Sequence, residues 1–293
     1  MNMSKSLPIY ADLSVPKKKI ARDTVFHLVM IALCLVMVYP FLWAVISSFK
    51  TTGQLYGESP LNLLPNPVTG DNYGRLFEVL PFKRFMLNSM VLSLIVPTAM
   101  ILVASLAAYA LTRTRFKGRN VLFIFFISTM MLPSHVTLIP NYKIMVDLKL
   151  INTYWAILLY SMFTAANAFN IFFFRQYFLT IPKDLENAAV VDGCSRVSIF
   201  FRIILPNAKP AIATTAILSF RSVWNSFLWP MLVLNDYEKL TLTVGLKYLK
   251  EWEPNWGVIL AGASLSIVPI IVVFIIFQKY FMASTVNSGF GGK

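Results

Sequence analysis

A group of polar side chains interrupts the otherwise apolar segment Pro210–Leu234. On a single helix at about 100° per residue these side chains share an arc of about 160°; they are Ser219, Arg221, Ser222, Asn225, Ser226 and Trp229. A charge in the middle of a membrane costs about 2.5–3.5 kcal/mol on insertion scales, so the arc should face protein or a water-filled pathway. Arg221 and Asn225 are able to donate hydrogen bonds to solute oxygens, and Trp229 offers a flat apolar face to a cyclic solute. The alternative is that Arg221 pairs with backbone carbonyls or with a partner subunit.

Residue patterns for catalysis or metal binding are missing from the sequence. It has no glycine-rich phosphate loop, no nucleophile elbow and no paired His/Glu zinc motif. His27 and His135 each lie near the end of an apolar segment without a second ligand at metal spacing, which favours interfacial histidines. Cys34 and Cys194 lie in different environments, so no disulfide is expected. We therefore predict that the chain is not an enzyme and binds no metal or cofactor itself.

The composition predicts an all-α polytopic membrane protein. Of 293 residues, 57% are hydrophobic and only 13% are charged, and the mean hydropathy is +0.66. Six segments reach the roughly 20 apolar residues that span a bilayer: Thr24–Phe49, Phe85–Thr112, Asn120–Ile139, Leu150–Tyr177, Pro210–Leu234 and Val258–Met282. The expected organisation is an N-terminal segment (1–23), one six-helix domain (24–282) and a small-residue tail (283–293).

The net charge of +13 is concentrated on one face of this topology. The termini and the loops around 113–119 and 175–209 hold 16 Lys/Arg and 5 Asp/Glu, whereas the other three loops hold 9 and 8. Lys and Arg collect on the cytoplasmic side of membrane proteins. We therefore interpret the basicity as a topology signal rather than a nucleic-acid site, and both termini are expected in the cytoplasm.

The loop 181–212 has the pattern of ordered helix rather than of a linker. Pro182 and Asp184 are helix-start signals, and Gly193 is a stop signal after the small residues Ala188 and Ala189. A second helical run follows, with its apolar face expected at Val197, Phe200, Phe201, Ile204 and Leu205. Pro206 is expected to close this run, and Pro210 to open the next span. An ordered helix on the water side predicts a surface for a partner.

This loop resembles the EAA loop of importer-type ABC permeases. In that pattern a Glu-Ala-Ala triplet is followed three residues later by Gly and then by a downstream Leu-Pro. Here Ala188, Ala189, Gly193, Leu205 and Pro206 take the matching positions, while Asn187 stands at the motif's Glu and follows Glu186. The resemblance implies a coupling helix that contacts an ATPase subunit through Glu186, Asn187, Ala188, Ala189, Asp192 and Gly193.

Further blocks resemble the maltose-type carbohydrate permeases over nearly the whole chain. The first span ends in Ser48-Phe49-Lys50, and Trp224-Asn225-Ser226-Phe227 is similar to a Trp-Asn-x-Phe stretch of sugar permeases. The resemblance implies an inner-membrane subunit working by alternating access. Its implied partners are two ATPase subunits that carry ATP and Mg, a second homologous permease, an extracytoplasmic sugar-binding protein and a carbohydrate, but no nucleic acid.

The substrate is predicted only as a class. Arg221 favours an acidic sugar on charge grounds, and the chain also resembles the permease of an alginate-oligosaccharide importer. An ion-coupled secondary transporter is the alternative. Such a transporter would need intramembrane acids or broken helices for ion sites, and no Asp or Glu lies in any predicted span.

Overall fold

The computed structural model describes residues 17–57 and 62–289, and within these ranges the ordered elements are all helical. Three helices are long and apolar enough to cross a membrane: α1 (Lys17–Ser47), α4 (Phe82–Arg113) and α15 (Trp256–Gly289). They correspond to the first, second and sixth predicted spans. Helix α15 continues past Met282 to Gly289, so part of the expected tail is helical. Residues 1–16 and 290–293 of the predicted terminal segments lie outside the described ranges.

Two further apolar segments are bent at a break. Helices α7 (Tyr154–Phe163) and α8 (Ala168–Thr180) meet at 46° across η1 (Ala165–Asn167), where one straight span was expected. The other bend, of 78°, separates α12 (Lys209–Trp224) from the preceding segment Arg196–Asn207. That segment consists of α10 (Arg196–Ile199), the π-helix η2 (Phe200–Ile204) and α11 (Leu205–Asn207).

The predicted third span, Asn120–Ile139, is not a continuous helix. Helix α5 (Arg119–Thr129) ends four residues before Pro133, and α6 (Leu138–Asp147) begins only after several turns. Proline has no N–H and its ring clashes with the carbonyl four residues earlier; here the Thr129 carbonyl accepts from the N–H of Leu132 instead, at 3.2 Å. By length and composition the described residues hold three spanning helices, or up to five if each bent pair counts once, beside the shorter α5.

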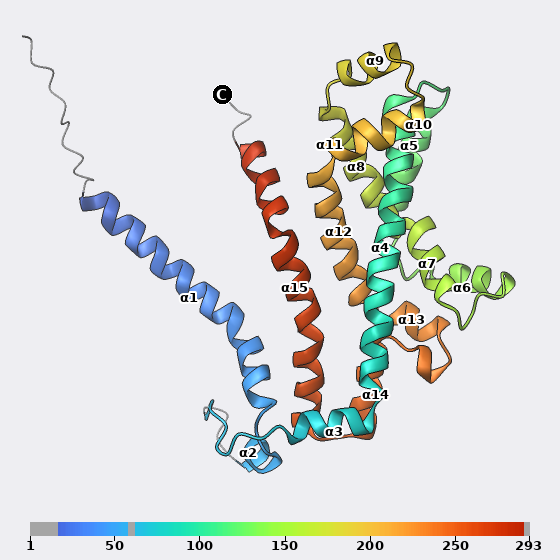
Figure 1. The fold of residues 1–293 in the computed structure, drawn as a ribbon. Helices are drawn as coiled ribbons and strands as arrows, with labels where there is room; N and C mark the ends of the chain where they lie inside the picture. The colour runs from blue at the N-terminus through green and yellow to red at the C-terminus, as the bar shows by residue number, and fades with distance from the viewer. Residues whose placement is uncertain (1–16, 58–61, 290–293) are drawn as a thin grey trace, which may run out of the picture.

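The helices form a bundle with a helical layer at each end (Figure 1). Helix α4 packs on α8 and α12, and α12 packs on α15. One end carries α9 (Asp184–Val191) with α10 and α11, while the opposite end carries α2 (Thr52–Gly57), α3 (Asp71–Val79) and α14 (Leu242–Trp252). Two smaller helices, α13 (Leu228–Val233) and η3 (Tyr237–Lys239), connect α12 to α14. Helix α1 leans away from the bundle, and its apolar window is not buried by the rest of the chain.

A glycine on α14 permits close packing against α4. A Cβ atom built at Gly245 would lie 2.2 Å from Cδ2 of Phe85, whose side chain is fully buried and packs edge-on against Tyr237. We expect Gly245→Ala to lower the free energy of unfolding by about 1–3 kcal/mol, as overpacking does. The measurement is thermal unfolding of the purified protein in detergent.

The matched control for this prediction is Gly74→Ala. Gly74 lies within α3, and a Cβ atom there meets nothing within 4 Å. Alanine should therefore be neutral or stabilising by about 0.5–1 kcal/mol at that position. Equal effects of the two substitutions would contradict the packing assigned to Gly245.

Candidate functional site

Helix α9 forms one surface of the candidate site, and its ends are set by local sequence. The acidic residues Asp184 and Glu186 lie in its first turn, where they oppose the positive end of the helix dipole. Gly193 ends the helix with φ +78°, the left-handed conformation that closes many helices. Its N–H donates to the Val190 carbonyl at 3.0 Å, and the N–H of Cys194 donates to the Ala189 carbonyl at 2.9 Å.

The two faces of α9 divide the six predicted coupling residues. Asn187, Ala188, Asp192 and Gly193 are exposed, whereas Glu186 and Ala189 are buried against the bundle. The exposed face is therefore small and weakly polar, and Val191 beside it is also exposed. Glu186 does not lie on this face in the structure.

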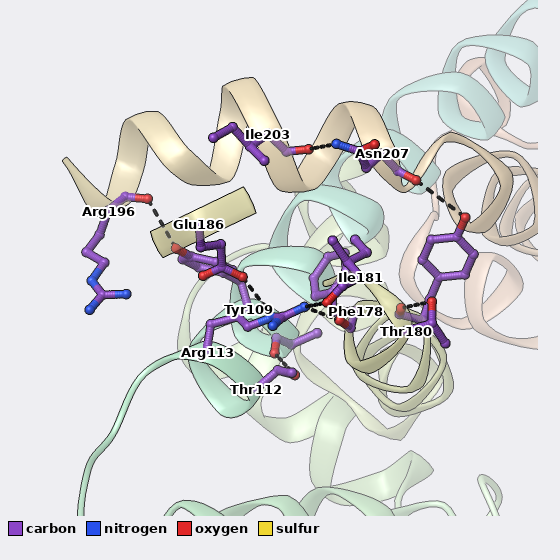
Figure 2. A network of polar contacts seen from close by, with 12 residues as sticks. Tyr109, Thr112, Arg113, Phe178, Thr180, Ile181, Glu186, Arg196, Ile203 and Asn207 are labelled. Atoms are coloured by element: carbon purple, nitrogen blue, oxygen red, sulfur yellow. Dashed lines mark hydrogen bonds and ion pairs between the residues drawn. The ribbon is translucent and has the colours of Figure 1, made fainter. Parts of the chain in front are cut away.

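Glu186 instead forms a buried ion pair with Arg113 at the end of α4 (Figure 2). Nε of Arg113 lies 2.9 Å from Oε1 of Glu186, and the two side chains are only 3% and 7% exposed. Nη2 of Arg113 also donates to the carbonyl of Ile181 at 2.6 Å and to that of Phe178. One guanidinium thus joins α4, the C-terminal end of α8 and α9.

An apolar cluster beneath this pair continues from α9 to the start of α12. It contains Phe174, Phe178, Ala189, Ile199, Phe200 and Ile204. Tyr109 donates to the Arg196 carbonyl at 3.5 Å, and Tyr177 donates to the Asn207 carbonyl at 3.4 Å, as Figure 2 shows in part. The α9–α11 region is therefore one packed unit, in agreement with the predicted ordered helix.

The predicted apolar face of the second run is only partly correct. Phe200 and Ile204 are buried, but Val197 and Phe201 are exposed, and Ile199 is buried in their place. The π-helix η2 causes this difference because its wider turns shift the face that a regular helix would bury. Pro206 does not close the run at once, since α11 extends to Asn207, whereas Pro210 lies in the first turn of α12 as predicted.

At Gly193 the backbone conformation, and not the room available for a side chain, limits which residues are tolerated. No atom lies within 4 Å of a Cβ built there, but its positive φ disfavours side chains by about 1–2 kcal/mol. We expect Gly193→Val to weaken the α9 end and to reduce recovery of the complex with the ATPase subunit that the EAA-loop resemblance implies. Gly193→Asn should be tolerated because Asn enters this conformation more readily. The measurement is the amount of ATPase subunit that co-purifies with each variant; equal recovery of Val and Asn variants would contradict the prediction.

The second candidate surface lies where α12 ends. Arg221, Ser222 and Asn225 are exposed. The guanidinium of Arg221 forms no hydrogen bond or ion pair with the described part of the chain. Ser219 is buried and accepts from Asn170 at 3.1 Å, within an amide network that connects α12 to the α7–α8 break. The alternative that Arg221 pairs with carbonyls of its own chain is therefore not seen among the described residues.

The predicted polar arc does not continue to Trp229, because α12 ends at Trp224. In a continuous helix the Ser226 carbonyl would face Pro230. Proline has no N–H to donate to that carbonyl, and its ring would clash with it. Thr243 donates its hydroxyl to that carbonyl at 2.7 Å instead. Trp229 consequently lies on a separate helix, α13, where it is buried and donates to the Ala156 carbonyl at 3.1 Å.

This break opens a cavity of about 240 Å³. Ser226 and Trp229 line it together with Ser134, His135 and Tyr160. The rings of Tyr160 and Trp229 are stacked, with centroids 4.0 Å apart and an interplanar angle of 19°. Hydroxyl groups, an imidazole and an aromatic pair therefore converge on one space. Sequence reasoning missed His135 and Tyr160 here, although Pro133 and Pro230 marked the two breaks that bring the lining together.

Residues 100–285 match the family described as binding-protein-dependent transport system inner membrane component. The chain belongs to this family. The permease is 36% identical to the arabinooligosaccharides transport system permease protein AraQ of Halalkalibacterium halodurans, over 88% of this chain and 92% of that protein. It is 32% identical to the sn-glycerol-3-phosphate transport system permease protein UgpE of Brucella abortus, over 89% and 95% of the two chains.

Solved structures agree with this assignment. The permease superposes with a TM-score of 0.78, at 28% identity, on a chain of a bacterial ABC transporter involved in the import of the acidic polysaccharide alginate; the match covers 92% of this chain and all of that one. A second chain, from a bacterial alginate ABC transporter, shares the fold with a TM-score of 0.55 at 18% identity. The predicted membership in the ABC importer permeases is confirmed, and the relatives are permease subunits rather than enzymes. The placement of ATP and Mg on partner subunits stays a prediction.

Proposed function

We propose that the permease is one of two homologous membrane subunits of an importer for oligosaccharides. Within that class, the exposed Arg221 of α12 favours an acidic oligosaccharide such as alginate. The observation that carries the proposal is the cavity at the α12–α13 break, where the stacked Tyr160–Trp229 pair and the hydroxyls of Ser134 and Ser226 converge. Aromatic faces with a few convergent polar groups are the usual lining of small-molecule sites.

Arg221 supports the acidic subclass. Its guanidinium is exposed on α12 and has no anionic partner in the described chain, one turn before the break. A guanidinium forms charge-assisted and often bidentate bonds to carboxylates. The two relatives named for transport of alginate and of glycerol 3-phosphate handle anions, which also supports a charged substrate.

The proposed mechanism is alternating access driven by two ATPase subunits. The exposed face of α9, with Asn187, Ala188, Asp192 and Gly193, would contact an ATPase, and its end of the molecule would be cytoplasmic. When the ATPases close, α9 would move together with the adjoining ends of α4 and α8, because the Arg113–Glu186 pair ties it to them. The apolar cluster would carry α10, α11 and the start of α12 along with it. Such a bistable arrangement requires different contacts in its two states.

The other proposed partners are a binding protein, a second permease and the lipid bilayer. They are suggested by the family and by surfaces that this chain leaves exposed. The family depends on a binding protein, which would deliver the sugar at the end that carries α2, α3 and α14. The second permease would cover apolar surface such as that of α1, which this chain leaves exposed to its surroundings. The lipid bilayer would cover the rest.

The test is uptake by the complete importer in a strain that lacks its own copy of the permease. Alginate oligosaccharide, arabino-oligosaccharide and glycerol 3-phosphate are offered separately. We expect ATP-dependent uptake of the alginate oligosaccharide, with a KM that rises in His135→Ala but not in His27→Ala, the only other histidine. Uptake of glycerol 3-phosphate alone would overturn the oligosaccharide class, and uptake driven by an ion gradient without ATP would favour the secondary transporter.

A further inference from the structure

A cationic cavity of about 270 Å³ lies between the end of α4, the start of α5 and the helix α9. Its walls carry the side chains of Arg115, Arg119, Lys183 and Arg196, and its floor is the Arg113–Glu186 pair. Glu186 is the only carboxylate of the lining, and Arg113 already neutralises it. The other four cations therefore face one space without an anion from the cavity itself.

Part of this cationic lining is fixed in place. Nη1 of Arg119 donates to the carbonyls of Thr114 at 3.2 Å and Thr112 at 3.4 Å, which holds its guanidinium at the turn between α4 and α5. A guanidinium held in this way loses little conformational entropy when it binds a phosphate.

The cationic lining runs directly into apolar surface. A second, shallower hollow shares Arg115, Arg119 and Lys183 with the cavity and extends to Val121 in the first turn of α5. Beyond it, α5 has no buried residue, and Val121, Ile124 and Phe125 are each more than 60% exposed. A ligand that fits both surfaces has an anionic head and an apolar chain.

We propose that this cavity binds the headgroup phosphate of an anionic glycerophospholipid, whose acyl chains lie along α5. Basic pockets at the cytoplasmic side of membrane helices are suited to such headgroups. A carboxylate of a partner protein would use the cations alone, whereas a glycerophospholipid also uses the apolar surface of α5 that adjoins them. Because Asn187 and Val190 of α9 also line the cavity, a bound headgroup would contact the coupling helix itself.

The experiment measures lipid retention by the intact importer. The complex is purified in neutral detergent, incubated with phosphatidylglycerol, phosphatidylcholine or diacylglycerol, and weighed by native mass spectrometry. We expect selective retention of phosphatidylglycerol, weakened roughly tenfold or more in Arg115→Gln/Arg119→Gln. The Lys183 side chain makes no hydrogen bond within the described chain, so Lys183→Gln should not disturb folding. A smaller loss of lipid in this variant would show that the loss in the double variant is not caused by misfolding.

The matched control is Arg202→Gln/Lys209→Gln, two exposed cations of the α10–α12 region outside the cavity. This variant should retain phosphatidylglycerol as the unmodified protein does. Equal retention by the cavity variants, or equal loss in the control, would overturn the proposal. Full displacement of the lipid by millimolar inorganic phosphate would assign the cavity to a free anion instead. Binding to the isolated chain but not to the assembled importer would assign it to partner carboxylates.

Discussion

Arg113→Leu is expected to lower the stability of the α9 end by about 3–5 kcal/mol, because it leaves Glu186 as an uncompensated buried charge. It also removes the donor to the Ile181 and Phe178 carbonyls. Glu186→Leu should be somewhat less damaging, since Arg113 would keep those two carbonyl partners. Hydrogen exchange of residues 181–212 measures the local loss, and ATP-driven uptake measures its effect on transport.

The double variant Arg113→Met/Glu186→Met distinguishes the contribution of the charges to stability from that of the buried side-chain volume. Replacing both partners of a buried pair by apolar residues is often close to neutral, so this variant should be more stable than either single leucine variant. The exposed pair Lys247–Glu251, 3.5 Å apart on α14, is the control. Replacing one of its members should change stability by at most about 1 kcal/mol. Additive losses at Arg113 and Glu186 would contradict the buried pair.

Arg221→Gln has the second large expected effect, on transport rather than on stability. A hydrogen bond to a charged group contributes about 1.5–3 kcal/mol, so kcat/KM for an acidic oligosaccharide should fall by roughly ten- to a hundredfold. Uptake of a neutral oligosaccharide of similar length should change little. Thermal stability should stay within about 0.5 kcal/mol because the side chain is exposed.

Arg221→Lys provides the intermediate case, since lysine keeps the charge but loses the planar fork. We expect it to recover part of the uptake that glutamine loses. Unchanged uptake of the acidic substrate in Arg221→Gln would show that another group recognises the charge. Equal losses for acidic and neutral substrates would indicate a structural role for Arg221.

The sequence predicted those elements whose signals are local. Pro182, Asp184 and Gly193 gave the ends of α9, and uninterrupted apolar length gave α1, α4 and α15. The helices of the third and fifth spans end earlier than the sequence predicts, because Pro133 and Pro230 each deny a hydrogen bond to the carbonyl four residues earlier. The second of these breaks also moved Trp229 off the predicted polar arc.

The buried pair could not be predicted in the same way. Arg113 has the residue type and position of a topology signal, and nothing local distinguishes it from Arg115, which is exposed. Only the packing of α4 against α8 and α9 brings it to Glu186. For the same reason Glu186 was expected on the exposed face of α9, where Asn187 lies instead.

Cross-linking from the exposed face of α9 tests the central claim most directly. In the complete importer Cys34 and Cys194 are replaced by serine, and a single cysteine is placed at Ala188 or, as a control on the opposite end, at Lys247. A short thiol-reactive cross-linker should join Ala188→Cys to an ATPase subunit and leave Lys247→Cys free of it. Purification without any ATPase subunit, or cross-linking of the ATPase only from position 247, would contradict the assignment of α9 as the coupling helix.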